Sequence, residues 1–232
     1  MRPLTGEQML HVWERCQGEA PVGRALGILE AACPEWTRER LAALPVGGRD
    51  SRLLRLRELT FGPVLAGVAK CPECGEQAEM DFRCGDVLAG IEAPAEPMRA
   101  EIGGVSVEFR VPNSLDLLAA CRMPDLAAAR NVVLSRCVVG EQPESAVAAV
   151  LDRMEQADPQ AKVELTVTCP SCGRGWQALF DIAAYFWREI EVCARRIVRE
   201  IHTLARAYGW NESEILALSA WRRQLYVEMV GG

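Results

Sequence analysis

Two matching cysteine motifs hold the residues of this chain that are best suited to chemistry. Each has the form Cys-Pro-x-Cys-Gly, called a cysteine knuckle below, and together they contain Cys71, Cys74, Cys169 and Cys172. Two thiolates three residues apart, followed by a glycine that lets the backbone turn, can face one point. Zinc takes four such ligands in a tetrahedron. The two knuckles therefore predict one zinc ion per chain, bound by all four cysteines.

A site with four cysteine ligands leaves no position for water or substrate, so this zinc is expected to be structural rather than catalytic. The alternatives are two disulfides or four free thiols. A disulfide within a C-x-x-C motif is typical of redox proteins, and the thioredoxin type requires a βαβ pattern that the sequence around the knuckles lacks. We therefore favour the metal site.

The similarity between the two knuckles extends to their flanks. Residues 64–70 and 162–168 precede the knuckles and have the composition of strands, while Phe82 and Phe180 each follow the first cysteine of their knuckle by eleven residues. We expect two strand-knuckle-strand units that close on one ion, as in a zinc ribbon. The second and third cysteines are separated by 94 residues, so this ribbon must be interrupted by an inserted subdomain.

The chain as a whole is expected to have an α+β fold, in which the interrupted ribbon carries a small sheet with helices and is flanked by helices at both ends. The expected segments are residues 1–60 (N-terminal helices), 61–91 (first knuckle unit), 92–160 (inserted hairpin and helices), 161–181 (second knuckle unit) and 182–232 (a long helix and a helical hairpin). Half of the 232 residues are apolar, which is enough for a real hydrophobic core.

Local signals place several of the helix ends. Thr5 with Gln8, and Asn211 with Glu214, have the spacing of a capping box, which favours a helix start at each position. Another helix is expected to begin near Asp50.

Turn and proline signals organise the insertion. The pair Gly103-Gly104 is predicted to turn a hairpin, because alternating apolar residues lie on both sides of it. Pro124 and Pro143 are predicted to open the second and third of three helices, since proline is well tolerated in the first turn.

No stretch of about 18 apolar residues without charges occurs, and the first residues lack the apolar core of a signal peptide. We therefore expect a cytoplasmic protein, in which thiols stay reduced. Six cysteines lie outside the knuckles and are expected to be small buried hydrophobic residues: they are Cys16, Cys33, Cys84, Cys121, Cys137 and Cys193.

Charge is unevenly distributed. The net charge is −6, and residues 61–181, which carry both knuckles, hold 10 basic and 18 acidic side chains. A ribbon that binds nucleic acid needs a basic face to neutralise phosphates, so no nucleic-acid partner is expected. The richest basic run is Arg49, Arg52, Arg55 and Arg57, which is either a small binding patch or, as we favour, one face of an amphipathic helix.

Motifs of catalysis are missing from the sequence. It contains no G-x-x-x-x-G-K-[ST], no H-E-x-x-H and no G-x-S-x-G. Its two histidines, His11 and His202, lie on expected helices among apolar residues, where packing or surface roles are commoner than catalysis. We expect the protein not to be an enzyme.

Several short motifs resemble those of a known group of proteins. Residues 210–216 read Trp-x-x-x-Glu-Ile-Leu and residues 222–226 read Arg-Arg-x-x-Tyr, a pattern similar to small proteins encoded with phage tails and contractile injection systems. Residues 107–112 (Val-Glu-Phe-Arg-Val-Pro) and 134–138 (Leu-Ser-Arg-Cys-Val) resemble the baseplate hub assembly chaperone family of T-even-type phages. The resemblance spans roughly residues 49–230.

This resemblance implies an assembly chaperone or scaffold for the baseplate or hub of a contractile particle, with baseplate, hub or spike proteins as partners and no membrane partner. The alternative is a zinc-ribbon regulator associated with nucleic acid, which a salt-sensitive gel shift would support. A redox enzyme acting through C-x-x-C is a third possibility, which a thiol-disulfide exchange assay would reveal.

The client surface is expected on the C-terminal helices, where aromatic and arginine side chains of the kind that anchor protein interfaces are concentrated. The alternative is that these residues pack on the long helix that precedes them. The predicted partner-binding residues are Trp210, Ile215, Leu218, Trp221, Arg222, Arg223 and Tyr226.

Overall fold

The computed structural model describes residues 1–232 except 91–92, 95–96, 103, 141–143 and 232. The helices are α1 (Gly6–Cys16), α2 (Pro21–Ala32), α3 (Arg38–Ala42), α4 (Val46–Phe61), α5 (Ser114–Ala120), α6 (Leu126–Cys137), α7 (Glu144–Ala157), α8 (Ile182–Tyr208), α9 (Glu212–Ala217) and α10 (Ala220–Gly231), with the short 3-10 helices η1 (Cys84–Val87) and η2 (Pro159–Ala161). The strands are β1 (Val64–Lys70), β2 (Gln77–Arg83), β3 (Met98–Ile102), β4 (Val105–Phe109), β5 (Val138–Val139), β6 (Val163–Thr168) and β7 (Gly175–Phe180).

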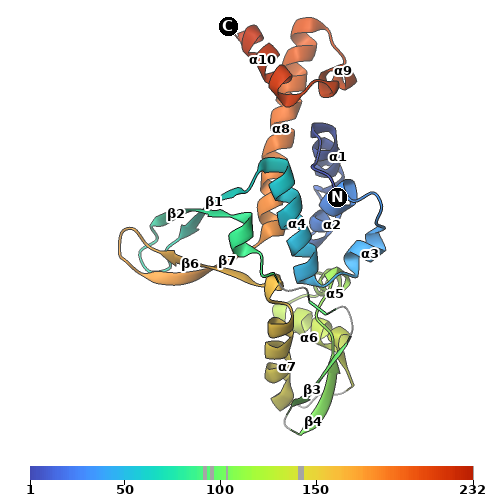
Figure 1. The fold of residues 1–232 in the computed structure, drawn as a ribbon, viewed down its shortest axis with the longest axis vertical. Helices are drawn as coiled ribbons and strands as arrows, with labels where there is room; N and C mark the ends of the chain where they lie inside the picture. The colour runs from blue at the N-terminus through green and yellow to red at the C-terminus, as the bar shows by residue number, and fades with distance from the viewer. Residues whose placement is uncertain (91–92, 95–96, 103, 141–143, 232) are drawn as a thin grey trace.

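A helical body forms the centre of the molecule, and α8 runs along it (Figure 1). Helices α1, α2, α4 and α8 share the larger hydrophobic core, whose fully buried side chains include Leu26, Leu53, Phe186 and Ile190. The capping box predicted for Thr5 and Gln8 is present. The Thr5 hydroxyl oxygen accepts a hydrogen bond from the backbone N–H of Gln8, and the Gln8 side-chain oxygen accepts one from the backbone N–H of Thr5. Burial of this apolar surface supplies the main driving force for folding.

Two antiparallel hairpins project sideways from the body and form a unit that we call the arm (Figure 1). Strand β1 pairs with β2, and β6 pairs with β7, each pair ending in a cysteine knuckle. Alternate side chains on each strand are less exposed, and Phe82 lies against Phe180 with ring centroids 5.2 Å apart. The two hairpins therefore pack through one apolar face each.

The residues between β2 and β6 form a second projection, which we call the insertion (Figure 1). Its three-stranded sheet has the order β3-β4-β5, and helices α5, α6 and α7 accompany the sheet. The insertion has its own small core, which includes Val107, Phe109, Val150 and Met154. Mixed helices with small antiparallel sheets confirm the predicted α+β class, whereas the division of the chain into five segments stays a prediction.

Helix α4 starts earlier than predicted, whereas helix α6 starts at Leu126 as expected but has a different cap. Helix α4 begins at Val46 rather than near Asp50, because Asp158, far away in sequence, accepts a hydrogen bond from the backbone N–H of Gly47 at 2.9 Å and satisfies a free donor of the first turn. Helix α6 is capped by Asp125, whose side chain accepts from the N–H of Ala128, and not opened by Pro124. The other two turn signals fall on Gly103 and Pro143, which lie outside the described residues.

The C-terminal helices form the end of the molecule opposite the insertion (Figure 1). Helix α8 ends at Tyr208 and is capped by Gly209, which adopts a left-handed φ of 69°, a conformation that glycine reaches without strain. The predicted capping box of Asn211 and Glu214 opens α9. Among the described residues, none of the helices combines the length and the apolar character that a membrane span needs.

Candidate metal centre

The two knuckles have the same backbone geometry. In each, the N–H of the glycine donates to the carbonyl of the first cysteine, at 3.0 Å for Gly75 and 3.1 Å for Gly173. Both glycines have positive φ, 76° and 73°, which explains why glycine follows the second cysteine. The N–H of each first cysteine continues the hairpin ladder, at 2.8 Å for Cys71 and 2.9 Å for Cys169. Each knuckle is therefore a tight turn at the end of a rigid hairpin.

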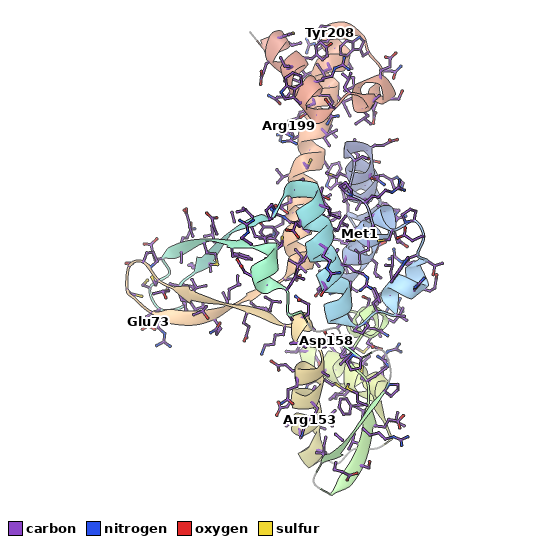
Figure 2. The ribbon with its side chains drawn as sticks, in the orientation of Figure 1. Met1, Glu73, Arg153, Asp158, Arg199 and Tyr208 are labelled. Atoms are coloured by element: carbon purple, nitrogen blue, oxygen red, sulfur yellow. The ribbon has the colours of Figure 1, made fainter. Side chains whose placement is uncertain are left out.

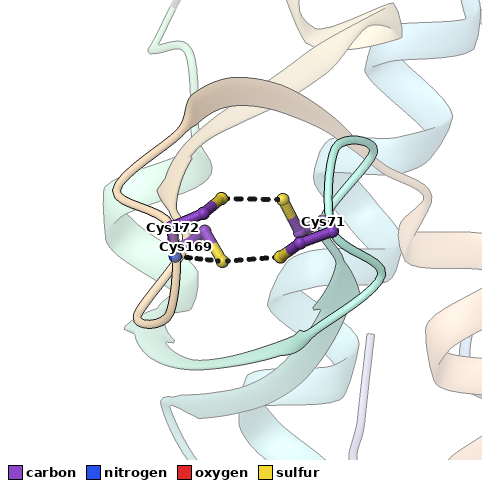
Figure 3. Close-up of side chains that lie close together, drawn as sticks. Cys71, Cys169 and Cys172 are labelled. Carbon is purple, nitrogen blue, oxygen red and sulfur yellow. Dashed lines mark hydrogen bonds between the residues drawn. The ribbon is translucent and has the colours of Figure 1, made fainter.

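The four thiols meet at the tip of the arm, where the knuckles face each other (Figure 3). All four sulfur atoms lie within 4.8 Å of one another. The Sγ atoms of Cys71 and Cys172 are 3.7 Å apart, and those of Cys74 and Cys169 are 3.5 Å apart. A tetrahedral ion with metal–sulfur bonds of ~2.3 Å has sulfur–sulfur edges of ~3.8 Å. The cluster therefore has the ligand type, number and spacing to hold a metal ion.

These separations exclude the disulfide alternative in this structure, since a disulfide bond is ~2 Å long and the four cysteines are free. The first cysteine of each knuckle, Cys71 or Cys169, is buried, whereas the second, Cys74 or Cys172, is exposed. The backbone N–H of Cys172 donates to Cys169 Sγ at 3.5 Å. An N–H group directed at a sulfur is the kind of outer contact that stabilises a metal thiolate.

The thiols affect one another's protonation. Hydrogen bonds from the backbone at Cys172 and Ser171 lower the pKa of Cys169 to about 7. A backbone hydrogen bond at Glu76 acts to lower the pKa of Cys74 as well, but the contact of Cys74 with the Cys169 sulfur, together with partial desolvation by its neighbours, outweighs that bond and raises the pKa of Cys74 to about 12. Four thiolates at this distance repel one another, so a bound cation is needed to ionise them together.

The root of the arm is anchored to the helical body by polar contacts. The Tyr185 hydroxyl on α8 donates to the carbonyl of Ala66 at 3.0 Å and accepts from its N–H at 3.1 Å. Arg57 on α4 donates to the carbonyl of Gly62 at 2.8 Å and pairs with Glu189 at 2.6 Å. The sequence alone did not predict these anchors, because Tyr185 and Ala66, and likewise Arg57 and Glu189, are more than a hundred residues apart in the chain.

The insertion contains a buried ion network that the sequence did not reveal. Asp116 is fully buried and accepts from Arg110 at 2.6 Å and from Arg136 at 2.7 Å. Burial acts to raise the pKa of Asp116, but these guanidinium groups and the backbone N–H of Asn113 outweigh it and lower the pKa to about 2. The network connects the start of α5, the end of β4 and the end of α6.

Two of the seven residues predicted to bind a partner are buried within the chain. Ile215 has no exposed surface, and Arg223 is 5% exposed. Arg223 pairs with the buried Glu200 of α8 at 2.9 Å and donates to the carbonyl of Leu218 at 2.7 Å. These two side chains hold the C-terminal helices on α8, which corrects their assignment to an accessible surface.

The other five predicted residues keep some exposure. The Trp210 ring stacks on the Tyr208 ring with centroids 4.7 Å apart, and it meets the Tyr226 ring edge-on with centroids 5.0 Å apart. These aromatic side chains therefore support the turn between α8 and α10. Leu218 is half-buried and Arg222 is exposed. Trp221 is 73% exposed. Their role in binding stays a prediction.

Three smaller expectations are resolved by burial. Arg49 and Arg57 are buried and paired with acidic side chains, so the arginine run on α4 does not form a continuous basic patch. Five of the six cysteines outside the knuckles are buried as expected, but Cys121 is exposed because it lies just beyond the end of α5. Both histidines, at positions 11 and 202, are exposed.

Comparison with known proteins places the chain in a family. Residues 25–140, half of the chain, match the family model described as T4 bacteriophage base plate protein. The match begins before residue 49, the start of the noted resemblance, and ends before the second knuckle and the C-terminal helices. No curated protein and no solved structure matches the chain. The match covers most of α2 with all of α3 and α4 in the helical body, the first hairpin of the arm, and the insertion as far as β5, but it leaves out α1 and α8. Because it spans half of the chain, the chain belongs to the family of T4 bacteriophage base plate proteins.

Proposed function

We propose that this protein is an assembly chaperone or scaffold for the baseplate or hub of a contractile phage-tail-like particle. Its membership of the base plate family supports a role with baseplate proteins. The proposal that the protein binds a client rests mainly on an exposed apolar face of α10. Trp221 and Met229 on this helix are 73% and 65% exposed, and the half-buried Leu225 lies between them at helical spacing.

This face differs from ordinary exposed apolar residues because its side chains are contiguous. Residues at i, i+4 and i+8 lie on one side of a helix, so Trp221, Leu225 and Met229 form a stripe on α10. The opposite side of α10 is held on α8 by Arg223 and Glu200. A helix fixed by one face with an apolar stripe on the other is suited to bind a groove or helix of a partner.

We further propose that the cysteine cluster binds one zinc ion that clamps the two hairpins together. The sulfur distances suit a tetrahedral ion, for which zinc and iron are the usual candidates. Elemental analysis of protein purified without added metal should find one zinc per chain. Iron, with the visible absorption of an iron–thiolate site, would instead contradict the zinc assignment while leaving the clamp in place.

Co-expression with baseplate, hub or spike proteins from the same gene cluster, followed by pulldown, tests the client surface. Trp221→Ala and Met229→Ala should each weaken capture, with the tryptophan truncation lowering affinity by about thirtyfold, which corresponds to about 2 kcal/mol. Leu126→Ala is a matched control, because Leu126 is an 86% exposed apolar residue on α6 at the other end of the molecule.

The circular dichroism spectra of the variants should equal that of the wild type, since all three side chains are largely exposed. If both α10 variants capture the same client as strongly as the wild type, the proposal for α10 is wrong. Capture that is lost equally in Leu126→Ala would show a nonspecific apolar effect.

A further inference from the structure

A second surface lies between the end of α4 and the middle of α8. A groove of about 450 Å³ is present there, and its lining includes Phe61 from α4 and Val192 and Cys193 from α8. Phe61 is fixed in place because its ring meets Phe186 edge-on at 6.0 Å. Val192 is 69% exposed. An apolar floor therefore reaches the surface of a helix that is otherwise polar on this side.

Arginine side chains surround this apolar floor. Arg188 and Arg196 line the groove, and Arg199 is exposed on the same helix (Figure 2). Positions 188, 192, 196 and 199 follow one another at steps of three or four residues, so their side chains lie along one side of α8. This arginine stripe is continuous with the mouth of the groove.

The positive charge of the stripe is only partly neutralised by the protein itself. Arg188 and Arg199 make no hydrogen bond or ion pair within the described part of the chain. Arg196 forms an ion pair with Glu200 at 3.4 Å, which is longer than the 2.9 Å pair that Glu200 already makes with Arg223. Glu189, the acidic residue at the groove, is held by two hydrogen bonds from Arg57 at 2.6 and 2.9 Å.

We infer that the α4–α8 groove binds an acidic segment of a partner protein. One large apolar side chain of that segment would enter against Phe61 and Val192, and its carboxylates would pair with Arg188, Arg196 and Arg199. Complementary charge steers such a segment to the groove, while burial of the apolar side chain supplies much of the affinity. This surface is separate from the α10 face, so it goes beyond the proposed function and can fail without it.

Two other occupants fit the surface less well. A second copy docked by a two-fold axis would bring the same arginine stripe against itself, and like charges would repel. Nucleic acid would contact the arginines, but the single aromatic side chain of the groove, Phe61, already packs against Phe186 instead of offering a face for base stacking.

Fluorescence polarisation with the full chain tests this inference. The probes are a short fluorescein-labelled peptide of glutamates around a central Leu-Phe pair, the same peptide with lysines in place of the glutamates, and a single-stranded thymidine oligonucleotide. The glutamate peptide should bind and the other two should not. Arg188→Glu combined with Arg199→Glu should weaken that binding about tenfold or more, which corresponds to about 1.4 kcal/mol.

A matched control keeps the net charge of the variant constant. Arg55→Glu combined with Arg130→Glu reverses two exposed arginines on α4 and α6 that lie outside the groove lining, and it should bind the glutamate peptide as the wild type does. Val192→Asp should weaken binding without removing an arginine. Arg188 and Arg199 are exposed and make no ion pair within the described residues, and Val192 is 69% exposed, so these variants should fold normally.

Three results would overturn the inference. The first is equal binding of the glutamate peptide by the wild type and by the Arg188→Glu and Arg199→Glu double variant, and the second is tight binding of the oligonucleotide that the same variant abolishes. The third is a dimer in light scattering that this variant dissociates, because the groove would then be an interface between copies. None of these results bears on capture of a client by α10.

Discussion

The arm and the insertion are two small β-containing units that leave the same helical body, and they are held together by different means. The arm consists of two hairpins whose inward side chains are mostly half-buried, with a few buried ones such as Leu65, Ala78 and Val167, and it has four thiols between the hairpins at its tip. The insertion has a closed core of its own and a buried carboxylate bound by two arginines. If the thiols bind a metal as proposed, one small unit is closed by a metal cluster and the other by packing around an ion network, and perturbations should separate the two.

Loss of the proposed metal should have the largest effect, and it should be confined to the arm. Cys169→Ser removes one of the four ligands, and structural zinc can contribute on the order of 10 kcal/mol to a small site. We expect amides of β1, β2, β6 and β7 near the knuckles to lose protection in hydrogen exchange, while β3 and β4 stay protected. Cys121→Ser, at an exposed cysteine outside the cluster, is the control.

Loss of protection in the insertion as well would contradict the independence of the two units. Unchanged protection throughout, with metal content reduced, would show that hairpin packing alone closes the arm.

Breaking the ion network should have the next largest effect, this time in the insertion. Asp116→Asn removes the negative charge between Arg110 and Arg136. We expect a loss of about 3 kcal/mol, near the lower end for breaking a buried pair, because the two arginines keep some contact with water. Urea unfolding followed by exchange at β4 and α6 measures this loss.

The exposed pair Arg99–Glu108, on the same sheet, provides a contrast to that network. Arg99→Ala should cost less than about 1 kcal/mol, as is typical of exposed ion pairs. Equal losses in Arg99→Ala and Asp116→Asn would mean that burial of the carboxylate is unimportant.

Acid should act on the insertion through the same carboxylate. The pKa of Asp116 is about 2 in the folded protein and about 3.9 in an unfolded chain, so its contribution is fully present above the unfolded value and is lost as pH falls toward the folded one. That contribution is on the order of 2 to 3 kcal/mol. The free energy of unfolding of the insertion should be lower at pH 3 than at pH 6, because part of this contribution is lost between the two. In Asp116→Asn the difference between the two pH values should be smaller.

The smallest expected effect concerns the root of the arm. Tyr185→Phe removes both hydrogen bonds between α8 and Ala66 while keeping the ring that packs against Phe180. Exposed hydrogen bonds contribute little net stability, so we expect a loss of about 1 kcal/mol, seen as faster exchange in β1 alone. A change that reaches the insertion would show that the two units are coupled through the body.

Much of the local structure followed from the sequence. The capping boxes of Thr5 and Asn211 are confirmed because such caps join groups only three residues apart. The strand at residues 64–70 is also where it was predicted. The four cysteines could be grouped from sequence because each knuckle is a local turn and a tetrahedral ion needs two of them.

What the sequence could not determine are contacts between distant segments. Helix α4 starts at Val46 because Asp158 binds Gly47 across 111 residues, and a side chain β-carbon on Gly47 would collide with that carboxylate. Asp158 itself is buried at the junction of the insertion and the body (Figure 2). No periodicity in the chain marks such a partner.

The tertiary structure also decided which residues are accessible. Arg223 and Trp221 are two positions apart on α10 and looked equivalent as interface anchors, yet one is buried against Glu200 and the other is exposed. The sequence by itself determined the knuckles, the capping boxes of Thr5 and Asn211 and the α+β class, because these depend on residues that are close in the chain. Only the packing of α10 on α8 determined which side chains remain free to bind a partner, since burial depends on the neighbours that folding brings together.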